Sequence, residues 1–114
     1  MPILFVETNQ ELDNDASQAF LDKAVDLLAD ILEKPKSGIM ARIAPGASFK
    51  LGETPDPAAY LELKLFAFPE GKVPVYINAL TDLLEKELGV APDRQFHEFI
   101  QMAPAMFGWN GKPC

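Results

Sequence analysis

The residue most able to do chemistry in this chain is Pro2, which follows Met1. Methionine before a small residue such as proline is normally removed, and its removal leaves a secondary amine. At the edge of an apolar strand, that amine loses hydration in its charged form, which lowers its pKa and provides a neutral base at about pH 7. The sequence therefore favours proton transfer at Pro2, although Met-Pro starts also have ordinary translational and processing explanations.

Three other residues are candidates for the site, and for each of them a structural role and a functional role are both possible. Lys34 comes at the end of the first predicted helix, where a lysine either offsets the helix dipole or binds an acidic substrate beside Pro2. His97, the only histidine, lies inside a predicted strand, where a surface or packed role competes with catalysis. Trp109 lies in a glycine-containing tail, and either pins that tail to the core or lines a pocket.

Several other chemistries lack the residues that they need. Cys114 is the only cysteine, so paired-cysteine zinc and redox motifs are excluded. The chain has no phosphate-binding glycine loop and no Ser-His-Asp set at a usable spacing, so we expect neither a metal nor a cofactor. A net charge of −7 repels phosphate backbones and anionic lipids, so neither nucleic acid nor a membrane is an expected partner.

The 114 residues, 48% of them hydrophobic, fit one globular domain over residues 1–114. No basic leader precedes the first apolar residues, and no apolar run approaches the ~18 residues that span a bilayer. We therefore expect a cytoplasmic protein, with export by a route that needs no signal peptide left open.

Two similar halves, about 1–57 and 58–114, follow the same plan of strand, helix and strand. In the first half, the expected elements are an apolar strand at 3–6 that is buried on both faces, a helix over about 16–33 and a strand over 39–44. In the second half they are a strand over 60–68, a helix over about 74–88 and a strand over 96–102, followed by a largely irregular tail with room for one very short strand. The second helix is expected to bury Ile77, Leu80, Leu83, Leu84 and Leu88.

The predicted fold class is α+β, with two βαβ repeats that form a four-stranded mixed sheet. A helical crossover makes its flanking strands parallel and right-handed, so both helices cover the same face of the sheet. The other face is expected to carry leucine, isoleucine and phenylalanine with nothing in the chain to cover it. Such a face predicts an oligomer.

The chain resembles the macrophage migration inhibitory factor and D-dopachrome tautomerase family over nearly its full length. The resemblance rests on fragments in the same order, namely residues 1–9, Lys34-Pro35, the loop 52–57, Pro92-Asp93-Arg94 and residues 108–111. It implies a homotrimer whose sheets enclose a central barrel, with sites at the subunit interfaces.

The resemblance also implies a function and a set of site residues. Family members interconvert keto and enol forms of aromatic 2-oxo acids such as phenylpyruvate, with the terminal proline as general acid and base. By position, Pro2 would move the proton and Lys34 would hold the carboxylate or enolate oxygen of a small acidic substrate. The apolar walls of the pocket would come from Phe66, Phe107 and Trp109.

Three departures from the family pattern affect this expectation. Phe96 replaces a pocket tyrosine, which removes a hydroxyl donor, and Glu98 replaces an asparagine. Glu98 as a like charge 4 Å from the substrate would cost about 4 kcal/mol at an effective dielectric of about 20. Ala58 and Leu61 occupy the places of the family's Cys-x-x-Cys, so thiol oxidoreductase activity is not expected. Alternative functions are a non-catalytic trimer that binds another protein, such as a receptor, and a decarboxylase or hydratase that uses the same proline.

Overall fold

Two strand-helix-strand units make up most of the molecule. The computed structural model describes residues 1–114, and its first unit consists of β1 (Ile3–Thr8), α1 (Asn14–Leu32) and β2 (Met40–Ala44). The second unit consists of β3 (Ala59–Leu65), α2 (Val73–Leu88) and β4 (Gln95–Gln101). Short 3₁₀ turns span Lys36–Gly38, Pro92–Arg94 and Pro104–Met106, and the chain ends in a hairpin of β5 (Gly108–Trp109) and β6 (Lys112–Pro113).

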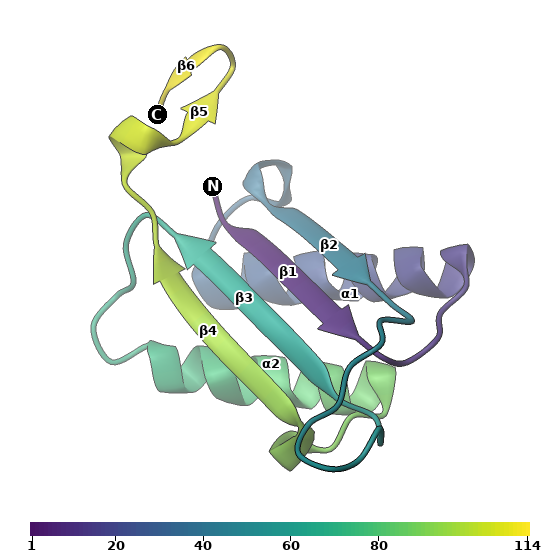
Figure 1. The fold of residues 1–114 in the computed structure, drawn as a ribbon. Helices are drawn as coiled ribbons and strands as arrows, with labels where there is room; N and C mark the ends of the chain where they lie inside the picture. The colour runs from purple at the N-terminus through teal and green to yellow at the C-terminus, as the bar shows by residue number, and fades with distance from the viewer.

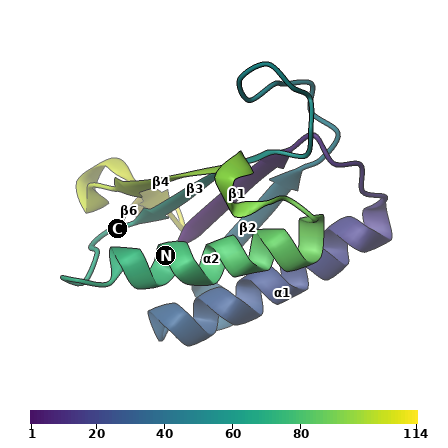
Figure 2. The ribbon, with the colours of Figure 1, turned by 90° about the horizontal axis from the view of Figure 1, so that it is seen from below.

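The four long strands form one mixed sheet in the order β2-β1-β3-β4. Within each unit the two strands are parallel, and the central pair β1 and β3 is antiparallel. Both helices pack on one face of this sheet and leave the other face open, as Figure 2 shows. The predicted mixed sheet with two helices on one face is therefore confirmed.

Helix α1 begins and ends with local backbone interactions that place Lys34. The Asp13 carboxylate accepts a hydrogen bond from the Ala16 N–H at 2.8 Å, which satisfies one free donor of the first turn. At the other end, Glu33 adopts a left-handed conformation with φ of 54°, and the Lys34 N–H donates to the Ala29 carbonyl at 3.2 Å. This end turns the chain toward β2. The core-facing side of the helix buries Phe20, Ala24, Leu28 and Leu32.

The leucines of the sheet all face the helices, which corrects the expected content of the open face. In β3, Leu61, Leu63 and Leu65 are buried in the core. The open face carries the expected isoleucine and phenylalanine in Ile3, Phe5 and Phe96, together with exposed or half-buried charged side chains. These charged residues are Glu7, Arg42, Glu62, Lys64 and Glu98. The strand β1 is thus buried on one face and only half covered on the other, rather than buried on both.

In the first turn of helix α2, the residue that faces the core is not the predicted one. Ile77 is 41% exposed, whereas Tyr76 is only 3% exposed. Buried residues then recur at spacings of three and four, at Leu80, Leu83, Leu84 and Leu88. The prediction for Ile77 is wrong because Tyr76, four residues before Leu80, continues the buried row.

The C-terminal segment leaves the sheet and projects beyond it. The predicted strand at 60–68 ends at Leu65. The tail contains two very short strands paired as a hairpin, where one very short strand was expected. Figure 1 shows this hairpin, in yellow, standing beyond the end of the sheet where β1 begins. All four residues of β5 and β6 are exposed. Neither helix has the length and apolarity that crossing a membrane requires.

Candidate active site at the head of the first strand

Pro2 lies at the head of β1, with its ring almost fully buried. Its carbonyl oxygen accepts a hydrogen bond from the Met40 N–H at 3.0 Å, which fixes the residue against β2. Pro2 borders two cavities, of about 290 Å³ and about 260 Å³. Met1 also borders both. Each cavity is slightly smaller than the ~300–1,000 Å³ that is usual for small-molecule sites.

The larger cavity, called the Lys34 cavity here, joins Pro2 to the end of α1 and the start of α2. Lys34 is exposed and stands at its rim, placed there by the turn at Glu33. Lys34 and Tyr76 are the only side chains with hydrogen-bond donors in its lining. The remaining lining residues are Met1, Pro2, Leu32, Leu65, Phe66, Ala67 and Pro69. The cavity therefore combines apolar walls with one cation and one hydroxyl.

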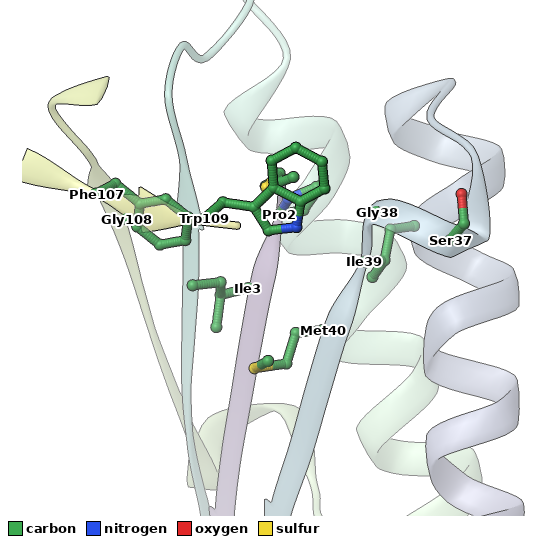
Figure 3. A pocket seen from close by; sticks show the side chains of 10 residues that line it. Pro2, Ile3, Ser37, Gly38, Ile39, Met40, Phe107, Gly108 and Trp109 are labelled. Atoms are coloured by element: carbon green, nitrogen blue, oxygen red, sulfur yellow. The ribbon is translucent and has the colours of Figure 1, made fainter. Parts of the chain in front are cut away.

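The smaller cavity, called the Trp109 cavity here, lies between the head of β1, the turn before β2 and the C-terminal segment. Figure 3 shows the side chains of Phe107 and Trp109 coming from one side and those of Ile39 and Met40 from the other. A Cβ atom added to Gly38, which also lines this cavity, would meet nothing within 4 Å. The Trp109 cavity is thus mainly apolar, with Ser37 adding a hydroxyl to its lining, and its width is not limited by a side chain at position 38.

An aromatic contact holds the C-terminal segment next to Pro2. The rings of Phe66 and Phe107 meet edge to face, with centroids 5.3 Å apart. The Met102 N–H also donates to the Leu65 carbonyl at 2.7 Å, so the segment leaves the sheet beside the end of β3. As Phe66 lines one cavity and Phe107 the other, their contact lies between the two.

Two of the predicted site residues, Phe96 and Glu98, do not reach Pro2 within one chain. Phe96 pairs with Tyr60, which pairs with Glu7 near the far end of β1 from Pro2. Glu98 is held on the open face by the Tyr60 hydroxyl, which donates at 2.7 Å and also contacts Glu62 at 3.0 Å. The hydrogen bond to Glu98, followed by burial and the Glu62 carboxylate, raises the pKa of Tyr60.

His97, on the opposite side of β4 from Phe96, is a packed residue held by Gln95. The Gln95 amide nitrogen donates to the Thr81 and Val90 carbonyls at 3.2 and 3.1 Å, so its oxygen faces His97 Nε2 at 2.9 Å. His97 Nε2 must then carry the hydrogen, and Nδ1 is buried with no partner. Burial lowers the pKa of His97, which keeps the ring neutral. His97 borders neither the Lys34 cavity nor the Trp109 cavity.

Sequence reasoning missed Tyr76 in the Lys34 cavity and Gly38 in the Trp109 cavity. Burial, and to a smaller extent the Glu33 carboxylate, raises the pKa of Tyr76, so its hydroxyl stays protonated. The spacing of four between Tyr76, Leu80 and Leu84 was a signal that this tyrosine belongs to the buried row. No three histidine, cysteine or acidic side chains form a group that could hold a metal ion.

Comparison with known proteins gives a consistent result over almost the whole chain. The family model described as macrophage migration inhibitory factor (MIF) matches residues 1–113. The MIF-like protein mif-2 of Caenorhabditis elegans is 33% identical, covering 97% of this chain and 92% of its own length. The macrophage migration inhibitory factor homolog of Brugia malayi is 31% identical, covering 97% and 96%. The homologue from Prochlorococcus marinus has the same fold, with a TM-score of 0.90 at 21% identity over 97% of both chains.

Proposed function

The chain belongs to the macrophage migration inhibitory factor family, and from that premise we propose that it is a keto–enol tautomerase of aromatic 2-oxo acids with Pro2 as its proton-transfer group. The observation that carries the proposal is the position of Pro2 between a mainly apolar cavity and a cavity with a cation. An aromatic 2-oxo acid has the matching parts, namely an apolar ring, a reacting carbon and a carboxylate. Phenylpyruvate is the simplest such substrate.

The base becomes available only after Met1 is removed. With Met1 attached, the Pro2 nitrogen is an amide and cannot take up a proton. Removal frees a secondary amine and also vacates the space that Met1 occupies beside both cavities. The burial of Pro2 disfavours the ammonium form of this amine, so a neutral base is present near neutral pH.

Tautomerisation then requires one proton to move between carbon and oxygen. In the direction from keto to enol, the Pro2 nitrogen takes the proton next to the carbonyl, and negative charge develops on the carbonyl oxygen. The Lys34 ammonium lies at the rim of the cavity on this side and stabilises the carboxylate or that oxygen. The protonated amine finally returns the proton to the oxygen, which regenerates the base.

The active form in this proposal is a homotrimer with a central barrel, as the resemblance implies. Phe96, 61% exposed on the open face of β4, and the exposed Trp109 give each copy apolar surface that a neighbour covers. In the trimer, Phe96 and Glu98 approach the Pro2 corner of an adjacent copy. The hydrogen bond from Tyr60 holds the Glu98 carboxylate on the sheet and so limits its repulsion of the substrate.

The direct test follows phenylpyruvate ketonisation by the processed protein, after mass spectrometry has confirmed the loss of Met1. We expect a rate well above that of buffer, and a loss of most of this rate in Pro2→Gly. Equal rates for parent and variant at the buffer level would overturn the proposal for this substrate and favour a non-catalytic binding protein.

A matched pair of lysine variants tests the role of Lys34. Lys34→Ala removes a charged hydrogen bond worth about 1.5–3 kcal/mol, so kcat/KM should fall about 10- to 100-fold. Lys36→Ala is the control, because Lys36 lines neither cavity and pairs with Asp26 on the surface. A similar loss in both variants would mean that general charge, rather than the position of Lys34, attracts the substrate.

A further inference from the structure

Tyr76 combines burial with a hydroxyl that has no protein partner. It lies in the first turn of α2, is only 3% exposed, and lines the Lys34 cavity together with Pro2. None of the side-chain hydrogen bonds of the chain involves its Oη atom, whereas the hydroxyl of the other tyrosine, Tyr60, donates to the Glu98 carboxylate and lies 3.0 Å from that of Glu62. A buried tyrosine hydroxyl usually has a hydrogen-bond partner, so the lack of a protein partner for the Tyr76 hydroxyl needs an explanation.

The hydroxyl of Tyr76 is in contact with open space. The only polar side-chain atom that is both wholly buried and without a partner is His97 Nδ1. The Tyr76 Oη atom is therefore not sealed inside the protein, and the Lys34 cavity is the space that its side chain borders. A hydroxyl sealed inside the protein without a partner would destabilise the fold. An arrangement that leaves it facing a cavity avoids this destabilisation and offers the O–H to a ligand.

The charges around Tyr76 keep it a donor. Its ring is buried among apolar residues, and the Glu33 carboxylate acts on it from the end of α1; both raise its pKa and oppose loss of the proton. Lys34, in the same cavity, is the only other side chain with a donor. A substrate oxygen in this cavity thus meets one cationic and one neutral donor, while the acceptor carboxylate of Glu98 is bonded elsewhere.

We propose that the Tyr76 hydroxyl donates a hydrogen bond to the 2-oxo oxygen of the substrate and stabilises the negative charge that develops there. This inference rests on the proposed function. No proton needs to leave Tyr76, because the Pro2 amine both takes and returns it. Tyr76 thereby supplies, from a helix of the same chain, a neutral donor of the kind that Phe96, which has no hydroxyl, does not offer.

The kinetic test is Tyr76→Phe, which keeps the ring and its packing and removes only the hydroxyl. Because the hydrogen bond strengthens as charge develops, we expect kcat for phenylpyruvate to fall about tenfold, with KM changed less than about twofold. The thermal midpoint should stay the same or rise, since no protein hydrogen bond is lost. Asn78→Ala, an exposed change on the same helix, should leave kcat and KM unchanged.

A spectroscopic test reads the contact itself. The chain has two tyrosines, so 3-fluorotyrosine labelling gives two ¹⁹F signals, which Tyr60→Phe assigns. Saturation with phenylpyruvate should shift the Tyr76 signal, and 3-phenylpropionate, which lacks the 2-oxo oxygen, should shift it much less. Equal shifts with both acids, or none with phenylpyruvate, would overturn the inference, as would an unchanged kcat in Tyr76→Phe.

These outcomes separate the inference from the function on which it rests. A parent protein that turns over no phenylpyruvate, but whose Tyr76 signal responds only to the 2-oxo acid, refutes the proposed tautomerase and supports the contact. An active parent with an unresponsive Tyr76 signal refutes the contact and leaves the tautomerase in place.

Discussion

Replacing Gln95 with leucine should lower the stability of the chain, because the Gln95 side chain joins β4 to α2 by a hydrogen bond that leucine cannot make. Gln95 is 9% exposed and makes three side-chain hydrogen bonds, to the Thr81 and Val90 carbonyls and with His97. Leucine fills a similar volume but leaves these three groups without a partner. At about 1 kcal/mol for each bond, Gln95→Leu should lower the free energy of unfolding by about 3 kcal/mol.

For a chain of this length, about 3 kcal/mol corresponds to a fall of about 10 °C in the thermal midpoint. The assay is thermal unfolding followed by circular dichroism at a fixed protein concentration, since assembly would make the midpoint depend on concentration. Gln101→Leu, at the exposed end of the same strand, is the control and should change stability by less than about 0.5 kcal/mol. If the two variants unfold within about 2 °C of each other, the Gln95 network does not hold β4 on α2 as described.

Three further predictions concern His97, Glu33 and Gly38. Burial lowers the folded-state pKa of His97, so the unfolded chain binds a proton more readily than the folded chain, and the free energy of unfolding should be highest above about pH 6.5 and fall below it. Urea unfolding should show that His97→Gln loses less stability between about pH 7.5 and 5.5 than the parent. An equal loss in both would contradict this assignment. Glu33→Gly should raise the free energy of unfolding by about 0.5–1 kcal/mol, because only glycine adopts a φ of 54° without strain, and chemical denaturation measures it. Gly38→Leu should keep the thermal midpoint within about 2 °C of the parent, since a Cβ at position 38 has free space. The leucine should raise KM for phenylpyruvate about fivefold because it fills part of the Trp109 cavity. An unchanged KM would show that the substrate does not enter this cavity.

The order and type of the elements were predictable because each carries a simple periodic pattern. The apolar spacing of three and four in α1 indicated its buried side, and Phe20, Ala24, Leu28 and Leu32 are indeed buried. Alternation also located the strands to within a few residues. Alternation does not show which of the two sets of alternate residues in a strand faces the helices. For this reason leucines were expected on the open face as well.

The first turn of α2 shows a second limit of pattern reading. Tyr76 and Ile77 are adjacent, and hydrophobicity alone favours isoleucine for the core. The structure buries Tyr76 because the row through Leu80 and Leu84 continues to it, while Ile77 points outward. Ranking residues by hydrophobicity therefore hid the one helix side chain that brings a hydroxyl into the Lys34 cavity.

The candidate site was only partly accessible from the sequence. Pro2, Lys34 and Phe66 line one cavity, and Pro2, Phe107 and Trp109 line the other. Their roles remain predictions. Phe96 lies level with Glu7 toward the far end of β1, and Glu98 lies level with Phe5, two strands away from β1. Their distance from Pro2 depends on strand register, which the residue types of single strands did not show. Only an assembly of several copies would bring them to a Pro2 corner.

The two strand-helix-strand units have similar corners with opposite properties. The 3₁₀ turn inside each unit ends just before the outer strand of that unit, the first at Gly38 and the second at Arg94. Gly38 lines a cavity at its corner, whereas the Arg94 guanidinium ties the other corner to the loop before β3 by donating to the carbonyls of Leu51, Thr54, Asp56 and Pro57. The two similar units can therefore have different roles. The hydrogen bonds of Arg94 fix the corner of the second unit, whereas a side chain at position 38 would change the shape of the Trp109 cavity in the first unit and so the molecules that fit it.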